Sequence, residues 1–237
     1  MNRSVSGLTK LRGPDTPALI GPLGNLGDLY AKAGQYSRAE KLLSRALSMT
    51  RAYGRQPEVE ARLLTTLGNV YVGEHKDTLA EQAADEALQD FKAMKDPPPD
   101  ISAVYSLLGS LCLRSGRSAE AESWLQQSLS FRESTLPPDD QLIAYSAANL
   151  AIFYAWSDQP EKARPLFQRA AATFEASGGD TDFVRTFYAH YADFERKSNH
   201  RKEARELSRR VDQLWPHTAR NTLSSQIVDV SALQSSR

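Results

Sequence analysis

Residues 25–47 of the chain, NLGDLYAKAGQYSRAEKLLSRAL, decide the fold. Apolar side chains recur at steps of three and four on both sides of the segment AGQYS, residues 33–37, which predicts two helices joined by a turn. Gly34 is expected to end the first helix in a left-handed conformation. Ser37 and Glu40 have the spacing of a capping box at the start of the second helix. The stretch therefore predicts a helical hairpin.

The first of these helices contains an internal glycine, Gly27, and the same glycine returns at intervals of 41 residues as Gly68 and Gly109. A glycine inside a helix costs roughly 1 kcal/mol relative to alanine. We therefore expect each glycine to face the second helix of its pair at close range. Small residues follow it in a constant register within the second helix: Ala39 and Ala46, Ala80 and Ala87, Ala121 and Ser128, Ala163 and Ala170, and, more weakly, Ala204 and Val211.

One unit repeated five times predicts an all-α solenoid of stacked antiparallel helix pairs. The connecting segments carry the Gly, Pro and Asp residues that are typical of short turns between helices. In the fourth unit Asp158 and Glu161 have capping-box spacing, with Pro160 in the first turn. The repeats are expected at residues 17–54, 57–95, 99–135, 140–177 and 180–216.

The two ends of the chain differ from the repeats. Residues 1–16 resemble the tail of an earlier repeat, and residues 217–237 are rich in serine and lack periodicity, which predicts a flexible tail. A first repeat without a cap is expected to expose an apolar face and to favour self-association.

The composition excludes several function classes. The 29 Lys and Arg residues balance 29 Asp and Glu residues, so we expect neither nucleic acid nor a membrane as a partner. One cysteine and four dispersed histidines provide no metal-ligand spacing, and no glycine-rich phosphate loop is present, so we expect no metal and no cofactor. Cys112 is expected to be an inert buried thiol. The N-terminal residues lack the apolar run of a signal peptide, which favours a cytoplasmic location.

Catalytic chemistry has little support in the sequence. His190 and Asp193 have a spacing that allows contact on one helix, and a structural hydrogen bond explains that pair better than catalysis does. The basic segment 200–210, HRKEARELSRR, is interpreted as a solvated helix face, with an acidic partner as the alternative. We therefore expect a protein that is not an enzyme.

The repeated residues resemble the tetratricopeptide repeat, whose pattern has a Leu-Gly pair, a tyrosine three positions later and small residues in the second helix. Leu26, Gly27 and Tyr30 match it here. The period is longer than the roughly 34 residues of the basic repeat. Such long units, with segments like AEKLLSRAL and ARPLFQRAA, are similar to the kinesin-light-chain subclass, which is common in bacterial proteins. This resemblance implies a right-handed superhelix over about residues 17–215.

The resemblance also implies that the first helices of the units line a concave groove that holds a peptide or a partner domain. Carried over position by position, the expected groove residues are Asn25, Asp28, Lys32, Arg62, Thr65, Asn69, Ser106, Ser110, Arg114, Tyr145, Asn149, Trp156, Asp193, Arg196 and Lys197. Only Asn69 and Arg114 approximate the carboxylate clamp of members that bind chaperone tails, so we do not expect that ligand.

The sequence therefore predicts a non-catalytic scaffold that binds a protein or peptide. The alternative is a regulatory or sensory repeat fragment of a larger protein whose effector domain, a kinase or a DNA-binding module, lies outside this chain.

Overall fold

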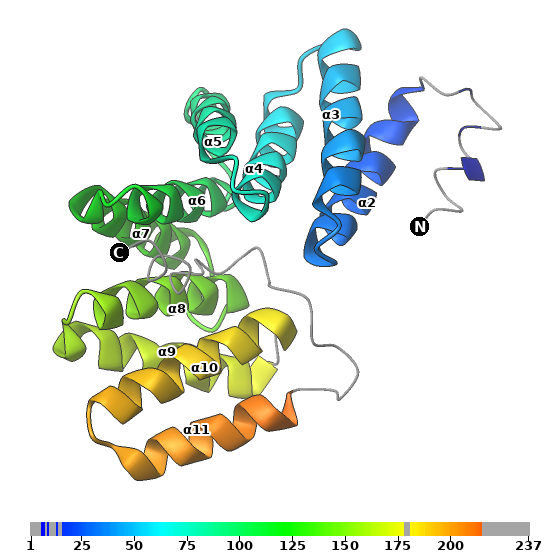
Figure 1. Cartoon of the computed structure of the whole chain (residues 1–237). Helices are drawn as coiled ribbons and strands as arrows, with labels where there is room; N and C mark the ends of the chain where they lie inside the picture. The colour runs from blue at the N-terminus through cyan, green and yellow to red at the C-terminus, as the bar shows by residue number, and fades with distance from the viewer. Residues whose placement is uncertain (1–5, 8, 10–12, 14–15, 178–180, 215–237) are drawn as a thin grey trace. The chain divides into compact units, whose positions relative to one another are not determined.

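The structure is a computed structural model, and it describes residues 6–7, 9, 13, 16–177 and 181–214. Ten α-helices and one short 3-10 helix make up this part of the chain, running from blue to orange in Figure 1. They are η1 Pro17–Leu19, α2 Ile20–Lys32, α3 Tyr36–Ala52, α4 Pro57–Gly73, α5 Asp77–Lys92, α6 Ile101–Arg114, α7 Ser118–Thr135, α8 Gln141–Trp156, α9 Pro160–Ser177, α10 Thr181–Lys197 and α11 Arg201–Gln213. The prediction of an all-α chain of about five helix pairs is confirmed. The expected tail at 217–237 lies outside the described residues, as does most of the segment 1–16.

The chain forms two compact units, residues 1–111 and 112–237, and the division falls within α6. In the first unit α2 packs on α3, α3 on α4, and α4 on α5. Its core is mainly aliphatic, with one fully buried ring, Phe91 of α5. Leu23 of α2 and Leu43 of α3 are fully buried, and α5 contributes Ala80, Ala84 and Ala87 at full burial. Alanines allow the helices to approach closely, so this unit is held by close backbone packing.

The second unit packs α7 on α8, α8 on α9, and α10 on α11, and its core is aromatic. Phe167 of α9 stacks on Tyr191 of α10 with ring centroids 4.7 Å apart and planes 2° from parallel. Phe174 meets Phe187 edge to face at 5.2 Å. Ala163 and Ala170 of α9 are fully buried in the register that the sequence predicts. Ala163, Phe167, Ala170 and Phe174 are spaced by four, three and four residues, so small and aromatic side chains alternate along one buried face of α9.

Each helix pair has a left-handed residue in its turn. Gly34 has φ 69° and Gly116 has φ 76°, and the equivalent positions are His75 (59°), Asp158 (54°) and Asn199 (64°). The amide after this residue donates back to a carbonyl in the last helical turn, as in Gln35 N to Tyr30 O at 2.8 Å. The four other turns contain the same bond, which identifies a Schellman motif in every pair. The left-handed helix end expected at Gly34 is confirmed.

The two expected capping boxes are wrong. Helix α3 begins at Tyr36 with Gln35 as its N-cap and no side-chain cap, and the Ser37 hydroxyl instead lies 3.3 Å from Glu74 Oε1. Helix α9 begins at Pro160, and Asp158 is left-handed, whereas an N-cap needs extended backbone. Asp158 is part of the Schellman turn of α8, and Ser37 already lies inside α3, so neither residue can be an N-cap.

The recurring glycines lie at close contacts. A Cβ added at Gly27 would stand 2.6 Å from Leu43 Cγ on α3, as the sequence predicts. At Gly68 the nearest atom is Leu107 Cδ2 at 2.5 Å, on α6, while Ala80 O of α5 is 3.5 Å away. The expectation that the glycine faces the second helix of its own pair therefore holds at Gly27 and is corrected at Gly68, where the first helix of the next pair is closer.

Ion pairs link consecutive second helices within each unit. Arg51 of α3 pairs with Glu86 of α5. In the second unit Arg169 of α9 pairs with Glu133 of α7, and Arg210 of α11 pairs with Glu175 of α9 at 2.7 Å. We call these three contacts the outer ladder. They join residues 35 or 36 positions apart, so the repeat length brings opposite charges together.

Candidate protein-binding surfaces

The groove residues expected on α2 and α4 are largely exposed, and several are already paired. Lys32 Nζ lies 3.1 Å from Asp28 Oδ2 one turn earlier in α2. The Arg62 guanidinium lies 3.0 Å from Glu58 and 2.9 Å from Asp100, just before α6. Such exposed pairs contribute little to stability, so a ligand carboxylate can compete for the cations. Asn25 is exposed, and Asn69 and Ser106 are half-buried.

Two expected groove residues of the first unit are buried instead. Thr65 is 7% exposed and its hydroxyl donates to Ala61 O at 2.6 Å, while Ser110 is 7% exposed and donates to Leu107 O at 2.9 Å. Both hydroxyls are satisfied within their own helix. They offer almost no surface to a ligand.

The second unit presents a stripe on α8, defined here as Leu142, Tyr145, Asn149 and Trp156. Steps of three, four and seven residues place the four side chains on one helix face. Leu142 and Trp156 are 40% and 37% exposed, and both are among the five exposed large apolar side chains of the described residues. The Tyr145 ring is half-buried, with its centroid 4.5 Å from that of Phe183 on α10. The sequence analysis identified three of the four; Leu142 was missed because its apolar character predicts burial.

Asn149 in the middle of the α8 stripe has an unsatisfied polar atom. Its residue is 6% exposed, and its side-chain carbonyl oxygen Oδ1 has no hydrogen-bond partner among the described residues. Buried polar atoms are normally hydrogen-bonded, so this oxygen is an exception, and at this burial it offers almost no surface to a ligand.

The remaining expected groove residues are scattered in the second unit. Asp193 of α10 is half-buried and pairs with Lys197 at 2.9 Å and Arg196 at 3.1 Å. Arg114, at the end of α6, is half-buried. Cys112 is 3% exposed, which agrees with the expected burial of its thiol.

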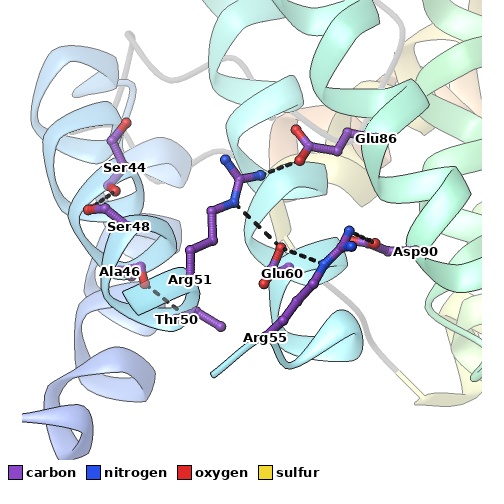
Figure 2. A network of polar contacts seen from close by, with 9 residues as sticks. All are labelled: Ser44, Ala46, Ser48, Thr50, Arg51, Arg55, Glu60, Glu86 and Asp90. Carbon is purple, nitrogen blue, oxygen red and sulfur yellow. Dashed lines mark hydrogen bonds and ion pairs between the residues drawn. The ribbon is translucent and has the colours of Figure 1, made fainter. Parts of the chain in front are cut away.

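A buried polar network in the first unit was missed by sequence reasoning (Figure 2). Glu60 of α4 is 1% exposed and lies 3.5 Å from Arg51 Nε and 3.6 Å from Arg55 Nε. Arg55 also pairs with Asp90 of α5 at 2.6 Å. Glu60 lies three and four residues before Leu63 and Leu64, so its position on the buried face of α4 was readable from the sequence. Its charged carboxylate predicts an exposed position instead, since unpaired charged side chains are seldom buried.

Burial in this network disfavours the ionised form of the Asp90 carboxyl. Burial raises the pKa of the Asp90 carboxyl above its ordinary value, with Glu60 and Glu86 adding to the rise and Arg55 and Arg51 opposing it. One oxygen each of Glu60 and Asp90 has no hydrogen-bond partner among the described residues. Because the two arginines come from α3 and the turn after it, the network fastens α3 to α4 and α5.

The described residues contain no cluster of three or more His, Cys, Asp or Glu side chains placed to hold a metal ion. None of the described helices is long and apolar enough to cross a membrane.

Comparison with known proteins identifies the repeats. Profiles of the family described as Tetratricopeptide repeat match residues 19–93, 59–134 and 143–177, which together cover most of the chain. The chain is 28% identical over 154 residues to the Arabidopsis thaliana protein KINESIN LIGHT CHAIN-RELATED 1. That match covers 64% of this chain and 25% of the relative, so the chain spans about a quarter of the length of the curated relative.

Solved structures share the fold at low identity. A Podospora anserina putative kinesin light chain with nearly identical repeats has a TM-score of 0.61 and 19% identity, covering 87% of this chain and 99% of that one. A Rap protein in complex with Competence and Sporulation Factor has a TM-score of 0.63 and 15% identity, covering 84% and 64%. At these identities the similarity concerns the fold alone.

Proposed function

Because the chain belongs to the tetratricopeptide-repeat family, we propose that it is a non-catalytic scaffold that binds a peptide or partner domain through its first helices. Repeats of this family generally mediate protein–protein interactions. Their first helices carry the recognition surface in such stacks. The long units are of the kinesin-light-chain type.

The exposed Trp156 on the α8 stripe is the observation that carries the proposal. Tryptophan is enriched among the residues that dominate binding energy, and Leu142 provides a second apolar anchor on the same face. The two anchors are 14 residues apart on α8, a distance of about 21 Å at 1.5 Å per residue. A peptide of about seven extended residues spans that length.

Polar groups between the anchors would orient the ligand. Asn149 lies between them, and its unsatisfied Oδ1 would accept a hydrogen bond from a peptide amide only if ligand binding exposed it. The proposed ligand is therefore a segment with apolar side chains and accessible backbone.

The test is affinity capture from a lysate of the source organism with three forms of the full chain. The intact protein is compared with a Leu142→Ala, Trp156→Ala variant and with a Tyr53→Ala, Leu79→Ala control, which removes two exposed large side chains elsewhere. We expect a partner retained by the intact protein and the control but lost from the stripe variant. Equal retention by all three would refute the α8 stripe as the binding surface.

A second candidate is a recognition module within a longer regulatory protein. The length of the curated relative, of which this chain matches a quarter, favours it. An antibody against these repeats would then detect a protein much larger than 26.3 kDa in the source organism. A band of 26.3 kDa alone would refute it.

A further inference from the structure

Helix α11 presents a row of cations that the fold does not use. Arg201, Lys202, Arg205 and Arg209 are all exposed. None of the four forms an ion pair with any residue that the structure describes. Their neighbour Arg210 behaves differently, because it pairs with Glu175 and lies over the Tyr188 ring at 4.9 Å. We call the four free cations the α11 basic stripe.

The geometry of the stripe is regular. Arg201, Arg205 and Arg209 are spaced by four residues, so they follow one helix face at steps of about 6 Å. Lys202 lies beside Arg205 and Arg209 on that face. On its opposite face α11 buries Ala204 and packs the partly buried Leu207 and Val211 against the aromatic core. Packing therefore fixes the orientation of the stripe toward solvent.

The stripe opposes the stability of its own helix. Arg201 and Lys202 are in the first turn of α11, where the helix dipole disfavours positive charge. Like charges at a spacing of four residues also repel one another. Glu203 in the same turn offsets part of this positive charge, and an anionic ligand would relieve the rest.

We propose that the α11 basic stripe docks an acidic helical segment of a partner protein, whose carboxylates are spaced one helical turn apart. This surface is separate from the α8 stripe. The exposed face of α11 has no aromatic or large apolar side chain, so it cannot stack nucleobases or insert into a bilayer. Glu203, Glu206 and Asp212 leave the helix with a small net positive charge, which suits discrete carboxylates better than a continuous polyphosphate.

The chain itself does not supply the occupant. Residues 215–237, which follow α11, contain two arginines and one aspartate and are therefore not acidic. The chain as a whole has a formal net charge of zero, which gives a second copy no overall electrostatic attraction.

The test uses a labelled peptide of about 16 residues with glutamates at every fourth position, long enough to form a helix. Its affinity for the full chain is measured by fluorescence anisotropy at about 0.15 M salt. The comparison peptide has the same composition in scrambled order. We expect saturable binding of the first peptide, and binding of the scrambled peptide that is weaker by about fivefold or more.

Two matched variants locate the binding. Arg205→Gln with Arg209→Gln removes two cations of the stripe, and Lys41→Gln with Lys95→Gln removes two exposed lysines of the first unit that form no ion pair with described residues. The stripe variant should bind about tenfold more weakly, and its melting temperature should be equal to or above that of the intact chain. The lysine variant should bind normally.

Four outcomes would overturn the proposal. The first is no binding of the acidic helix, the second is equal weakening by both variants, and the third is equal binding of both peptides. The fourth is tighter binding of a single-stranded oligonucleotide or an anionic phosphatidylserine vesicle than of the peptide, which would assign the stripe to another class of partner. Because Trp156 and Leu142 are unchanged in these variants, failure here leaves the α8 stripe untouched.

Discussion

Replacing Gly27 with alanine should destabilise the protein, although the same replacement stabilises most helices. The added Cβ would stand 2.6 Å from Leu43 Cγ and 2.8 Å from Leu43 Cδ2, distances that real Cβ atoms essentially never show. Leu43 is fully buried, so its branched end can move only by displacing other side chains of the core. Gly21 in the same helix α2 provides the control, because a Cβ there would meet nothing within 4 Å.

The expected magnitudes follow from two opposing effects. Overpacking a well-packed contact costs about 1–3 kcal/mol, and alanine regains about 1 kcal/mol of helix propensity over glycine. Gly27→Ala should therefore lower the free energy of unfolding by about 1 kcal/mol, whereas Gly21→Ala should raise it by about 0.5 kcal/mol. For a chain of this length, 1 kcal/mol corresponds to a Tm change of about 2–4 °C.

Thermal unfolding followed by circular dichroism at 222 nm, with urea unfolding as a second measurement, would separate the two variants. Opposite signs of the Tm change support the close helix contact as the reason for the recurring glycine. If Gly27→Ala raised the Tm as much as Gly21→Ala does, the packing argument would be wrong. A broadened transition in urea would indicate that the two units unfold separately, as stacked repeats can.

Three further results are expected. Gly68→Leu should destabilise by a few kcal/mol in urea unfolding, because Leu107 Cδ2 occupies the space of its Cβ; an unchanged midpoint would contradict this. Gly116→Ala should lower the Tm and Asp158→Gly should raise it, because each changes the free energy of unfolding by about 1 kcal/mol. Tm changes of the same sign in both variants would count against the left-handed turn. Asp90 has a raised pKa in the folded state, so the native protein binds its proton more tightly and gains stability below about pH 4 that is lost as pH rises. The stability advantage of the intact protein over Asp90→Asn should therefore shrink from pH 3.5 to pH 7 in urea unfolding, and a growing advantage would reverse the argument.

The parts of the fold that were predictable depend on periodic spacing. Burial of apolar residues at steps of three and four, and small residues at Ala39 and Ala46, follow from helix geometry and do not depend on the rest of the chain. The capping box at Ser37 failed because α3 begins one residue earlier, and the one at Asp158 failed because two local patterns competed for the same residue. A Schellman turn at Asp158 removes the extended backbone that a cap requires, and spacing alone cannot decide between them.

The candidate sites were harder to predict, because exposure and pairing depend on neighbouring helices. Thr65 and Ser110 match groove positions of the family but turn inward to their own backbone. Leu142 looks like core and is exposed, and Glu60 looks like surface and is buried. In both cases the helices packed around the residue, and not its hydrophobicity, determine whether the side chain is exposed.

The outer ladder should resist separation of the second helices within each unit. Its ion pairs join second helices only, so bending or stretching a unit to separate those helices must lengthen the contacts Arg169–Glu133 and Arg210–Glu175 before the aromatic core is disturbed. Exposed ion pairs weaken as ionic strength rises, whereas apolar packing does not. We therefore expect the force needed to separate the second helices of the second unit to fall as salt is added. Low-force extension of a single molecule would measure that force.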